Sequence, residues 1–245
     1  MFSFLLGYAV LALCVVLIFV FMRPRRYYLI RHGETLLNAE HVRQGVEGPL
    51  SRKGRAQAAA VARALESLPI GRILSSSYPR ARETAEILQG KLHSRIRYSP
   101  LLGERRNPRE IIGKSVEAPE AARIVDQIDL AVHEDDYRFS DEENFADLKA
   151  RAEICLVWLA RQHRREIVVV THHHFLKMLI AYMLYRERLH AADFVKLSFF
   201  NVSDNAGITV CEYHPWKRFS RTRGWEILAF NQQAQYPQLD TGQAS

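Results

Sequence analysis

The chain has 245 residues, of which 48% are apolar, 25% are charged and 10% are aromatic. These values exclude a disordered chain, a collagen-like repeat and a membrane protein with many spans. Lys and Arg number 34 against 27 Asp and Glu, which gives a net charge of +7. Three of the basic residues lie between residues 23 and 26, so the rest of the chain carries about +4, which suits an anionic ligand better than a nucleic acid.

Residues 1–22 carry no charge, and residues 4–22 form a run of 19 mostly apolar residues. As a helix this run would be about 28 Å long, close to the thickness of a bilayer core. A cleaved signal peptide, the main alternative, would have a basic start and a shorter apolar core. A buried core helix is the third interpretation. We expect a transmembrane anchor at residues 1–22, followed by a basic juxtamembrane linker at residues 23–26.

Arginines flank only the C-terminal end of this apolar run. Because basic flanks tend to stay on the cytoplasmic side, we expect a single-pass protein whose catalytic domain is cytoplasmic. The three cysteines, Cys14, Cys155 and Cys211, show no paired spacing, which favours reduced thiols over disulfides.

Short apolar runs then alternate with longer amphipathic segments. We predict strands or extended segments at residues 27–30, 72–75, 95–103, 167–171, 195–202, 207–213 and 225–230. We predict helices at residues 51–68, 79–92, 119–133, 144–164 and 175–185. This order indicates a three-layer α/β/α sandwich, mainly a parallel sheet with an antiparallel edge, formed by residues 27–231. Residues 232–245 lack periodicity and are predicted to be a flexible tail.

Polar residues follow the ends of the predicted strands. Arg31 and His32 follow the first strand, His172 follows residues 167–171, and Arg80 and Glu104 follow two other extended segments. Ligands of open α/β sheets bind beyond the carboxyl ends of the strands, so these groups are expected to converge. Arginine forks match phosphate oxygens, a neutral imidazole can attack phosphorus, and a carboxyl group can donate a proton and later activate water. The set therefore indicates phosphoryl chemistry.

The segment Arg31-His32-Gly33-Glu34-Thr35, with Asn38, resembles the RHG signature of the histidine phosphatase superfamily, which includes cofactor-dependent phosphoglycerate mutases. Further elements resemble that family in the expected order: Arg43-Gln44-Gly45, residues 49–58, Ser76 with Arg80-Ala81 and Thr84-Ala85, Leu102-Gly103-Glu104, Glu143-Asn144-Phe145 with Asp147, Val170-Thr171-His172, and Asn205 with Gly207-Ile208-Thr209. The resemblance covers roughly residues 27–231.

The resemblance implies a role for each matching residue. His32 would be the nucleophile, and Arg31, Arg80 and His172 would hold the phosphate oxygens. Glu104 would donate a proton and then act as a base. The expected substrate-binding residues are Thr35, Asn38, Gln44 and His173. The family needs no metal and no other cofactor for this chemistry.

Two departures from the family pattern bear on the substrate. The family usually has glycine after its second histidine, whereas His173 and His174 stand here. The family often has glycine near the position of Pro108, and the run of residues 105–108 makes that loop basic and stiffer.

Some of these residues have other interpretations. Three adjacent histidines can suggest a metal site, but side chains alternate in a strand, so we expect no metal there. Glu104 could instead pair with Arg105, Arg106 or Arg109 at the surface. We interpret Arg82 as a charge on a helix surface. The acidic residues 134–143 are expected to form a solvated loop or helix start.

Basic residues also cluster at 161–165 and at Lys217, Arg218, Arg221 and Arg223. The first cluster suits the C-terminal end of a helix. Together the two clusters could contact anionic lipid.

We therefore predict a membrane-anchored phosphatase that hydrolyses a phosphomonoester, or a phosphohistidine, through a covalent phosphohistidine intermediate. One alternative is a phosphoglycerate-mutase-like phosphoryl transferase that uses the same site. Another is a catalytically weak, membrane-held binding module, favoured only by His173 and His174. We expect a phosphorylated substrate and no nucleic acid partner. The pattern indicates neither the leaving group nor an oligomeric state.

Overall fold

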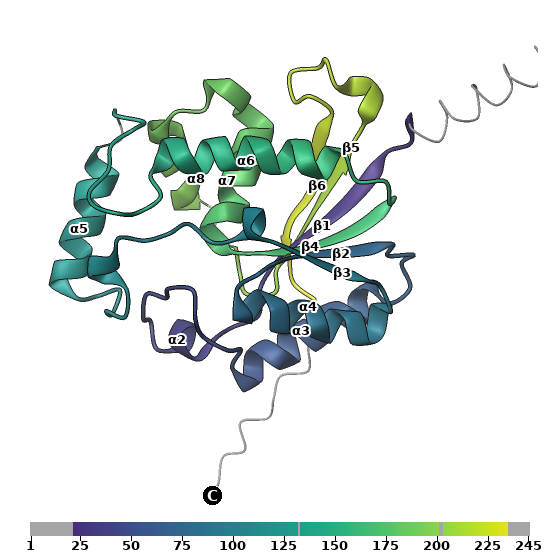
Figure 1. Cartoon of the computed structure of the whole chain (residues 1–245), viewed down its shortest axis with the longest axis horizontal. Coiled ribbons are helices and arrows are strands. Elements are labelled where there is room, and N and C mark those ends of the chain that lie inside the picture. Colours follow the sequence, from purple (N-terminus) through teal and green to yellow (C-terminus); the bar gives the residue numbers. More distant parts are fainter. Residues whose placement is uncertain (1–21, 132, 201–202, 235–245) are drawn as a thin grey trace, which may run out of the picture.

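The computed structural model describes residues 22–131, 133–200 and 203–234 (Figure 1). The predicted anchor, apart from Met22, and the tail from residue 235 onward lie outside these residues. Within the described ranges, no helix combines the length and the apolar character that a bilayer span requires. The anchor and its topology therefore stay predictions.

Strands and helices alternate along the chain. The strands are β1 (Arg25–Arg31), β2 (Arg72–Ser76), β3 (Ile96–Ser99), β4 (Glu166–Thr171), β5 (Ile208–Tyr213) and β6 (Trp225–Gln232). The α-helices of the described part are α2 (Leu36–Ala39), α3 (Arg52–Leu65), α4 (Pro79–Leu92), α5 (Pro119–Leu130), α6 (Phe145–Ala160), α7 (His173–Tyr185) and α8 (Ala191–Phe200). Short 3₁₀ helices are η1 (Pro100–Leu102), η2 (Arg109–Ile111), η3 (Arg186–Arg188) and η4 (Pro215–Lys217).

The strands form one sheet in the order β3-β2-β4-β1-β5-β6. The pairs among β3, β2, β4 and β1 are parallel, whereas β5 is antiparallel to β1 and β6 is antiparallel to β5. Helices α3 and α4 cover one face of the sheet, and α6 and α7 cover the other (Figure 1). The expected mixed sheet between two helical layers is confirmed.

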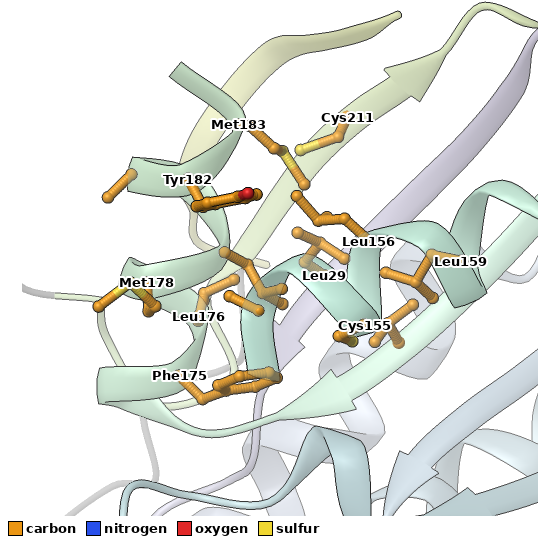
Figure 2. Packing of buried hydrophobic residues seen from close by; sticks show 14 of the residues in the cluster. Leu29, Cys155, Leu156, Leu159, Phe175, Leu176, Met178, Tyr182, Met183 and Cys211 are labelled. Carbon is orange, nitrogen blue, oxygen red and sulfur yellow. The ribbon is translucent and has the colours of Figure 1, made fainter. Parts of the chain in front are cut away.

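Two apolar clusters fill the space between the sheet and its helices. Side chains alternate along β1, so Tyr27 and Leu29 pack toward α6 and α7 while Tyr28 and Ile30 pack toward α3 and α4. Figure 2 shows Leu29 in the first cluster, among side chains of α6 and α7.

The cysteines of the described part lie in the same cluster. Cys155 and Cys211 are buried free thiols, as expected, and burial raises the pKa of each to about 12 (Figure 2). Both thiols are therefore inert packing groups at neutral pH.

The predicted strand at residues 195–202 is wrong, because α8 runs through residue 200. Its alternating apolar residues suggested a strand, but tertiary contacts favour a helix. Phe194 packs against Phe145 of α6, with 6.0 Å between the ring centroids. The Asp135 carboxylate also accepts a hydrogen bond from the Ala191 backbone N–H, at 2.8 Å, in the first turn of α8.

Most other predicted elements are present with shifted ends. The helices predicted at 51–68, 119–133 and 144–164 end three to four residues earlier. The helix predicted at residues 175–185 begins two residues earlier, at His173. This last shift changes the geometry of the histidine segment, as described below.

Candidate active site

The parallel strands β1, β2 and β4 end at one edge of the sheet. Arg31 of β1 pairs with Thr171 of β4, and Ser75 of β2 pairs with Val170 of β4. His32 and His172 therefore leave the sheet at the same level, and their ring centroids are 5.0 Å apart. The predicted convergence of Arg31, Arg80 and the two histidines at this edge is what the structure shows.

The hydrogen bonds of His32 define its tautomer. Its ring is buried, with 3% exposed, and Nδ1 lies 2.7 Å from the Gly33 carbonyl oxygen. The Arg80 Nε donates to the His32 Nε2 at 3.3 Å. A carbonyl can only accept and a guanidinium can only donate, so the proton is on Nδ1 and Nε2 carries a lone pair. Nε2 is thus the ring nitrogen that could act as a nucleophile.

The charge state of His32 agrees with this assignment. Burial, followed by the positive charges of Arg80 and Arg31, holds the pKa of His32 well below its usual 6.5. The ring is therefore neutral near pH 7, as a nucleophilic imidazole has to be.

Close backbone packing holds the turn that carries His32. The Gly33 N–H donates to the Thr84 hydroxyl at 3.1 Å, and the Asn205 amide donates to the His32 carbonyl at 3.1 Å. A Cβ at Gly33 would lie 2.4 Å from the Gly54 carbonyl oxygen, and a Cβ at Gly54 would lie 2.0 Å from the Glu34 carbonyl oxygen. Only glycine at both positions allows α3 to pack this closely under the turn.

Arg80 comes from the first turn of α4 and is 2% exposed. Its Nη1 donates to the carbonyl oxygens of Gly45 and Val46, at 3.0 and 2.9 Å. Burial lowers the pKa of Arg80, and the Glu104 charge opposes that shift. Since arginine remains protonated nonetheless, the structure fixes a desolvated positive charge beside the His32 Nε2.

Arg31 is the last residue of β1 and directly precedes His32. Its Nη1 donates to the Ser203 carbonyl oxygen, while its buried Nε has no protein partner within the described residues. Burial lowers the pKa of Arg31, and the charges of Glu104 and Asp204 oppose this. A phosphate oxygen would satisfy the remaining donor.

His172 is the N-cap residue of α7. Its Nε2 lies 2.8 Å from the Ser76 hydroxyl, which already accepts from the Tyr78 N–H at 3.2 Å. In the tautomer in which the Ser76 hydroxyl donates to Nε2, the His172 Nδ1 carries the ring proton and is a donor. Nδ1 is buried without a partner in the described part of the chain, and burial lowers the pKa of His172 well below 6.5.

His173 and His174 occupy the first turn of α7, not a strand, so the alternation from which we expected no metal does not apply. His173 Nδ1 contacts the Ser203 hydroxyl at 2.7 Å and the Arg31 Nη1 at 3.5 Å. Burial and neighbouring cations lower the pKa of each histidine to about 3. Across the described ranges, no cluster of three or more His, Cys, Asp or Glu side chains is arranged to hold a metal.

The Glu104 carboxylate binds the N-terminus of α7. One oxygen accepts from the N–H groups of Arg105 and Phe175, at 2.8 and 3.1 Å, and the other accepts from the His174 N–H at 3.3 Å. This position uses the positive end of the helix dipole. Glu104 forms no ion pair with Arg105, Arg106 or Arg109 in the described structure, so the alternative interpretation of Glu104 as half of a surface ion pair is wrong.

The segment that carries Glu104 is held by Arg151, which the sequence analysis missed. Arg151 donates to the carbonyl oxygens of Leu101 and Gly103, at 3.0 and 2.8 Å. It also makes a two-pronged ion pair with Glu143, with both distances at 2.6 Å. Glu143 and Arg151 lie eight residues apart around the start of α6, and this spacing alone does not identify such a contact.

Ser76, Thr84 and Ser203 contact the predicted site residues or their backbone: Ser76 contacts His172, Thr84 accepts from the Gly33 N–H, and Ser203 contacts His173. Ser76 and Thr84 belong to segments that resemble the family, but the sequence pattern indicates no role for them, and it does not identify Ser203 at all. Short polar side chains carry weak sequence signals because most of them lie in turns or caps. Their positions here follow from the fold.

Thr35, Asn38 and Gln44 form a linked group beside the site. Thr35 and Asn38 form a capping box at the start of α2, and the Gln44 amide donates to the Thr35 hydroxyl. The buried Oε1 of Gln44 has no partner among the described residues. The group lies next to His32 through Asn205, whose amide lies between the His32 carbonyl and the Asn38 Oδ1.

A cavity of about 320 Å³ lies next to Glu104 and α7. Both polar and apolar side chains line this cavity. The polar ones include Arg105, Asp129, His174 and Lys177, and the apolar ones include Ile128, Phe145, Leu148, Phe194 and Val195. Since His174 both lines this cavity and follows His173 in the first turn of α7, the cavity adjoins the histidine site.

Curated relatives match part of the chain. Probable phosphoglycerate mutase GpmB of Escherichia fergusonii is 45% identical over 78 residues, which cover 31% of this chain and 36% of that protein. The same-named protein of Escherichia coli O1:K1 is 50% identical over 62 residues, or 25% of this chain and 29% of that protein. The matches thus span about a third of these relatives.

Solved structures match the whole domain. A mycobacterial glucosyl-3-phosphoglycerate phosphatase in complex with VO3 has a TM-score of 0.67 and 26% identity over 84% of this chain and 99% of that chain. Mycobacterial hydrolase 2 has a TM-score of 0.70 and 25% identity over 89% and 94% of the two chains.

The sequence profile of the histidine phosphatase superfamily (branch 1) matches residues 27–226. This range contains the whole of β2 to β5, most of β1 and the start of β6, together with His32, Arg80, Glu104 and His172. The chain therefore belongs to the histidine phosphatase superfamily, branch 1.

Proposed function

We propose that this protein is a metal-independent phosphatase that hydrolyses a phosphomonoester through a phosphohistidine at His32. The observation that carries the proposal is the tautomer of His32, because the Nδ1–H bond to Gly33 and the Arg80 donor leave a lone pair on Nε2. A neutral, oriented imidazole close to two arginines is suited to attack an anionic phosphoryl group.

In the first step the His32 Nε2 attacks phosphorus, a P–N bond forms and the P–O bond to the leaving group breaks. Arg31, Arg80 and the His172 Nδ1–H neutralise the charge on the phosphoryl oxygens. Glu104, in its carboxylic acid form, gives its proton to the leaving oxygen. The Gly33 carbonyl accepts from Nδ1–H throughout, which stabilises the positive charge that develops on the ring.

In the second step water attacks the phosphohistidine. The Glu104 carboxylate takes a proton from the water, the P–N bond breaks, and inorganic phosphate leaves. The same residue thus serves as acid and base, and the neutral His32 is restored. The ion pair of Arg151 with Glu143 keeps the Glu104 segment in place for both steps.

The leaving group would occupy the cavity beside α7. Its mixture of charged and apolar lining residues suits an organic alcohol that carries polar groups.

We also propose that residues 1–22 anchor the protein in a membrane and that its catalytic domain lies on the cytoplasmic side. This rests on the uncharged run and the arginines that follow it.

A phosphoglycerate-mutase-like activity is the second candidate. It is supported by the relatives named probable phosphoglycerate mutase. The likeness to a structure named glucosyl-3-phosphoglycerate phosphatase favours hydrolysis. A mutase would return the phosphoryl group from His32 to bound product, whereas a phosphatase gives it to water.

The test is a screen of the full chain, in detergent, against a panel of soluble phosphomonoesters. Free phosphate and phosphoryl-transfer isomers are measured in the same reactions, and we expect free phosphate in excess. The His32→Ala variant should be inactive, while His163→Ala, which changes an exposed histidine, should keep full activity. Isomer formation without phosphate release would favour the mutase, and an active His32→Ala protein would contradict both.

A further inference from the structure

The segment between β5 and β6 has an unusual composition. Residues 214–224 contain four basic residues, two large aromatic residues and no acidic residue. Trp216 is 44% exposed and Phe219 is 86% exposed. The basic residues are Lys217, Arg218, Arg221 and Arg223, all exposed. Because apolar rings of this size are normally buried, this exposure needs a reason.

Two adjoining hollows surround Arg218. One, of about 410 Å³, is lined by Met22, Arg25, Trp216 and Phe219 among others. The second, of about 220 Å³, is lined by three further arginines, Arg161, Arg186 and Arg223. The two hollows share the residues Ala160, Tyr213 and Arg218.

The positive charge of this surface is only partly neutralised by protein groups. Lys217 pairs with Glu226, and Arg223 pairs with Glu187, both at the surface. The Arg218 guanidinium lies over the Phe219 ring, 4.7 Å from its centroid. Arg218 and Arg221 form no ion pair with any acidic residue of the described part. An anionic partner would therefore find unpaired guanidinium groups between exposed rings.

The surface lies where the described chain begins. Tyr213, the last residue of β5, pairs with Arg25, the first residue of β1, so the segment lies at the start of β1 (Figure 1, yellow-green beside purple). Met22 itself lines the larger hollow. The 19-residue apolar run of residues 4–22 thus leads directly to this surface.

We infer that residues 214–224, with Arg25 and Arg161, form a docking surface for an anionic lipid bilayer. Aromatic rings favour the membrane interface, where an apolar body meets a wet boundary. Arginines bind lipid phosphate groups and are attracted by the negative surface potential. The surface binds lipid through its own side chains, so it acts in addition to the proposed anchor.

This docking fixes the orientation of the active site. The surface lies at the edge where β1 begins, and His32 follows the end of that strand. At roughly 3.3 Å per residue, the seven residues of β1 hold His32 about 23 Å from the docked edge. The catalytic edge then faces the aqueous phase, so the substrate is a soluble phosphomonoester and not a lipid of the docked bilayer.

The test uses the full chain in vesicles of phosphatidylcholine, with or without phosphatidylglycerol, that carry a spin-labelled lipid quencher at a shallow depth. The signal of Trp216 is the fluorescence difference between the natural chain and its Trp216→Phe variant. We expect quenching of Trp216 in anionic vesicles and weaker quenching in neutral vesicles or at high salt. Arg218→Glu/Arg221→Glu should lower the docked-to-undocked ratio by at least about tenfold.

The matched control is Arg52→Glu/Arg123→Glu, which changes the net charge equally at exposed positions of α3 and α5. It should dock like the natural chain. Both double variants should hydrolyse a soluble substrate at the natural rate, which shows that they fold. If Trp216 is not quenched in anionic vesicles, or if the two double variants dock equally, the inference is wrong. Preference for an acidic protein over vesicles would also overturn it.

Alkaline carbonate extraction separates this surface from the anchor. A chain that resists extraction but shows no Trp216 quenching has an anchor without the docking surface. A chain that is extracted and yet shows salt-sensitive quenching before extraction has the surface without the anchor.

Discussion

The two edges of the sheet hold their arginines in opposite ways. At the catalytic edge, Arg80 is 2% exposed and its donors are directed at fixed acceptors. At the other edge, Arg218 and Arg221 are exposed and form no ion pair within the described residues. Buried charges act at short range and are little affected by salt, whereas exposed charges act over a Debye length and are screened. We propose that the same residue type serves catalysis at one edge and attraction to a surface at the other.

Substitutions at the catalytic edge, where the side chains are held in fixed positions, should have different effects from substitutions at the edge with exposed arginines. A small change at the catalytic edge should reduce activity by orders of magnitude, because each group has one required position. A change at the other edge should leave activity intact and alter membrane docking. The following substitutions test this contrast.

The largest effect is expected for His32→Ala, which removes the nucleophile. Activity toward any substrate of the natural protein should fall on the order of 10⁴-fold or more, since the remaining groups have no nucleophile to orient. Steady-state phosphate release measures the loss. A fall of less than tenfold would mean that His32 supports the site without forming the covalent bond.

Arg80→Lys should reduce kcat by about 10²- to 10³-fold. Lysine keeps the charge but lacks the fork that reaches both the His32 Nε2 and the Gly45 and Val46 carbonyl oxygens. The control is Arg82→Lys, which makes the same change at an exposed position two residues further along α4. This variant should keep the kcat of the natural chain. Equal activity of the two variants would show that charge alone is sufficient at residue 80.

The neutral, half-buried histidines at the start of α7 should make the fold sensitive to acid. The pKa of His174 lies at about 3, below the 6.5 of an unfolded chain, so the unfolded state binds the proton more readily. Its contribution to stability is complete above pH 6.5 and is lost as the pH falls toward 3, by about 2 kcal/mol between pH 7 and pH 5. Urea unfolding at both pH values measures this.

His174→Gln is the informative variant for that titration. It should lose less unfolding free energy than the natural chain between pH 7 and pH 5, by about the same 2 kcal/mol. The exposed His163→Gln variant should lose as much as the natural chain. If His174→Gln and the natural chain lose equal amounts, His174 is not held neutral by the fold.

Arg151→Met should have the smallest effect of the four, about a tenfold fall in kcat with little change in KM. Arg151 touches neither His32 nor the phosphate-binding groups and acts by positioning the segment that carries Glu104. Met keeps the stem that packs against Phe175. The circular dichroism spectrum and the thermal midpoint of the variant should match those of the natural chain. A low kcat with an altered spectrum would indicate a general loss of folding.

The catalytic edge was largely predictable from sequence because of strand topology. Parallel strands bring their carboxyl ends together, so the sequence alone predicts that Arg31, His32 and His172 meet. The motif elements supplied Arg80 and Glu104 in the same way. The sequence pattern did not predict the residues that hold these side chains in place. Ser76, Ser203 and Arg151 come close to the site only through the tertiary fold.

The predictions that failed share a physical cause. Residues 195–200 alternate as a strand would, but packing of Phe194 on Phe145 favours a helix. The helix α7 starts at His173 because Glu104, distant in sequence, binds its first N–H groups. In both cases a contact between distant segments decided the local structure, and no local pattern contains such a contact.

The most direct test of the central claim is to locate the phosphoryl group during turnover. The full chain is mixed with a good substrate, quenched in alkali to preserve phosphohistidine, digested and analysed by mass spectrometry. The account predicts phosphate on the peptide that contains His32, bonded to Nε2 and absent from the His32→Ala protein. Phosphate on His172 or His173, or turnover with no phosphohistidine at all, would contradict it.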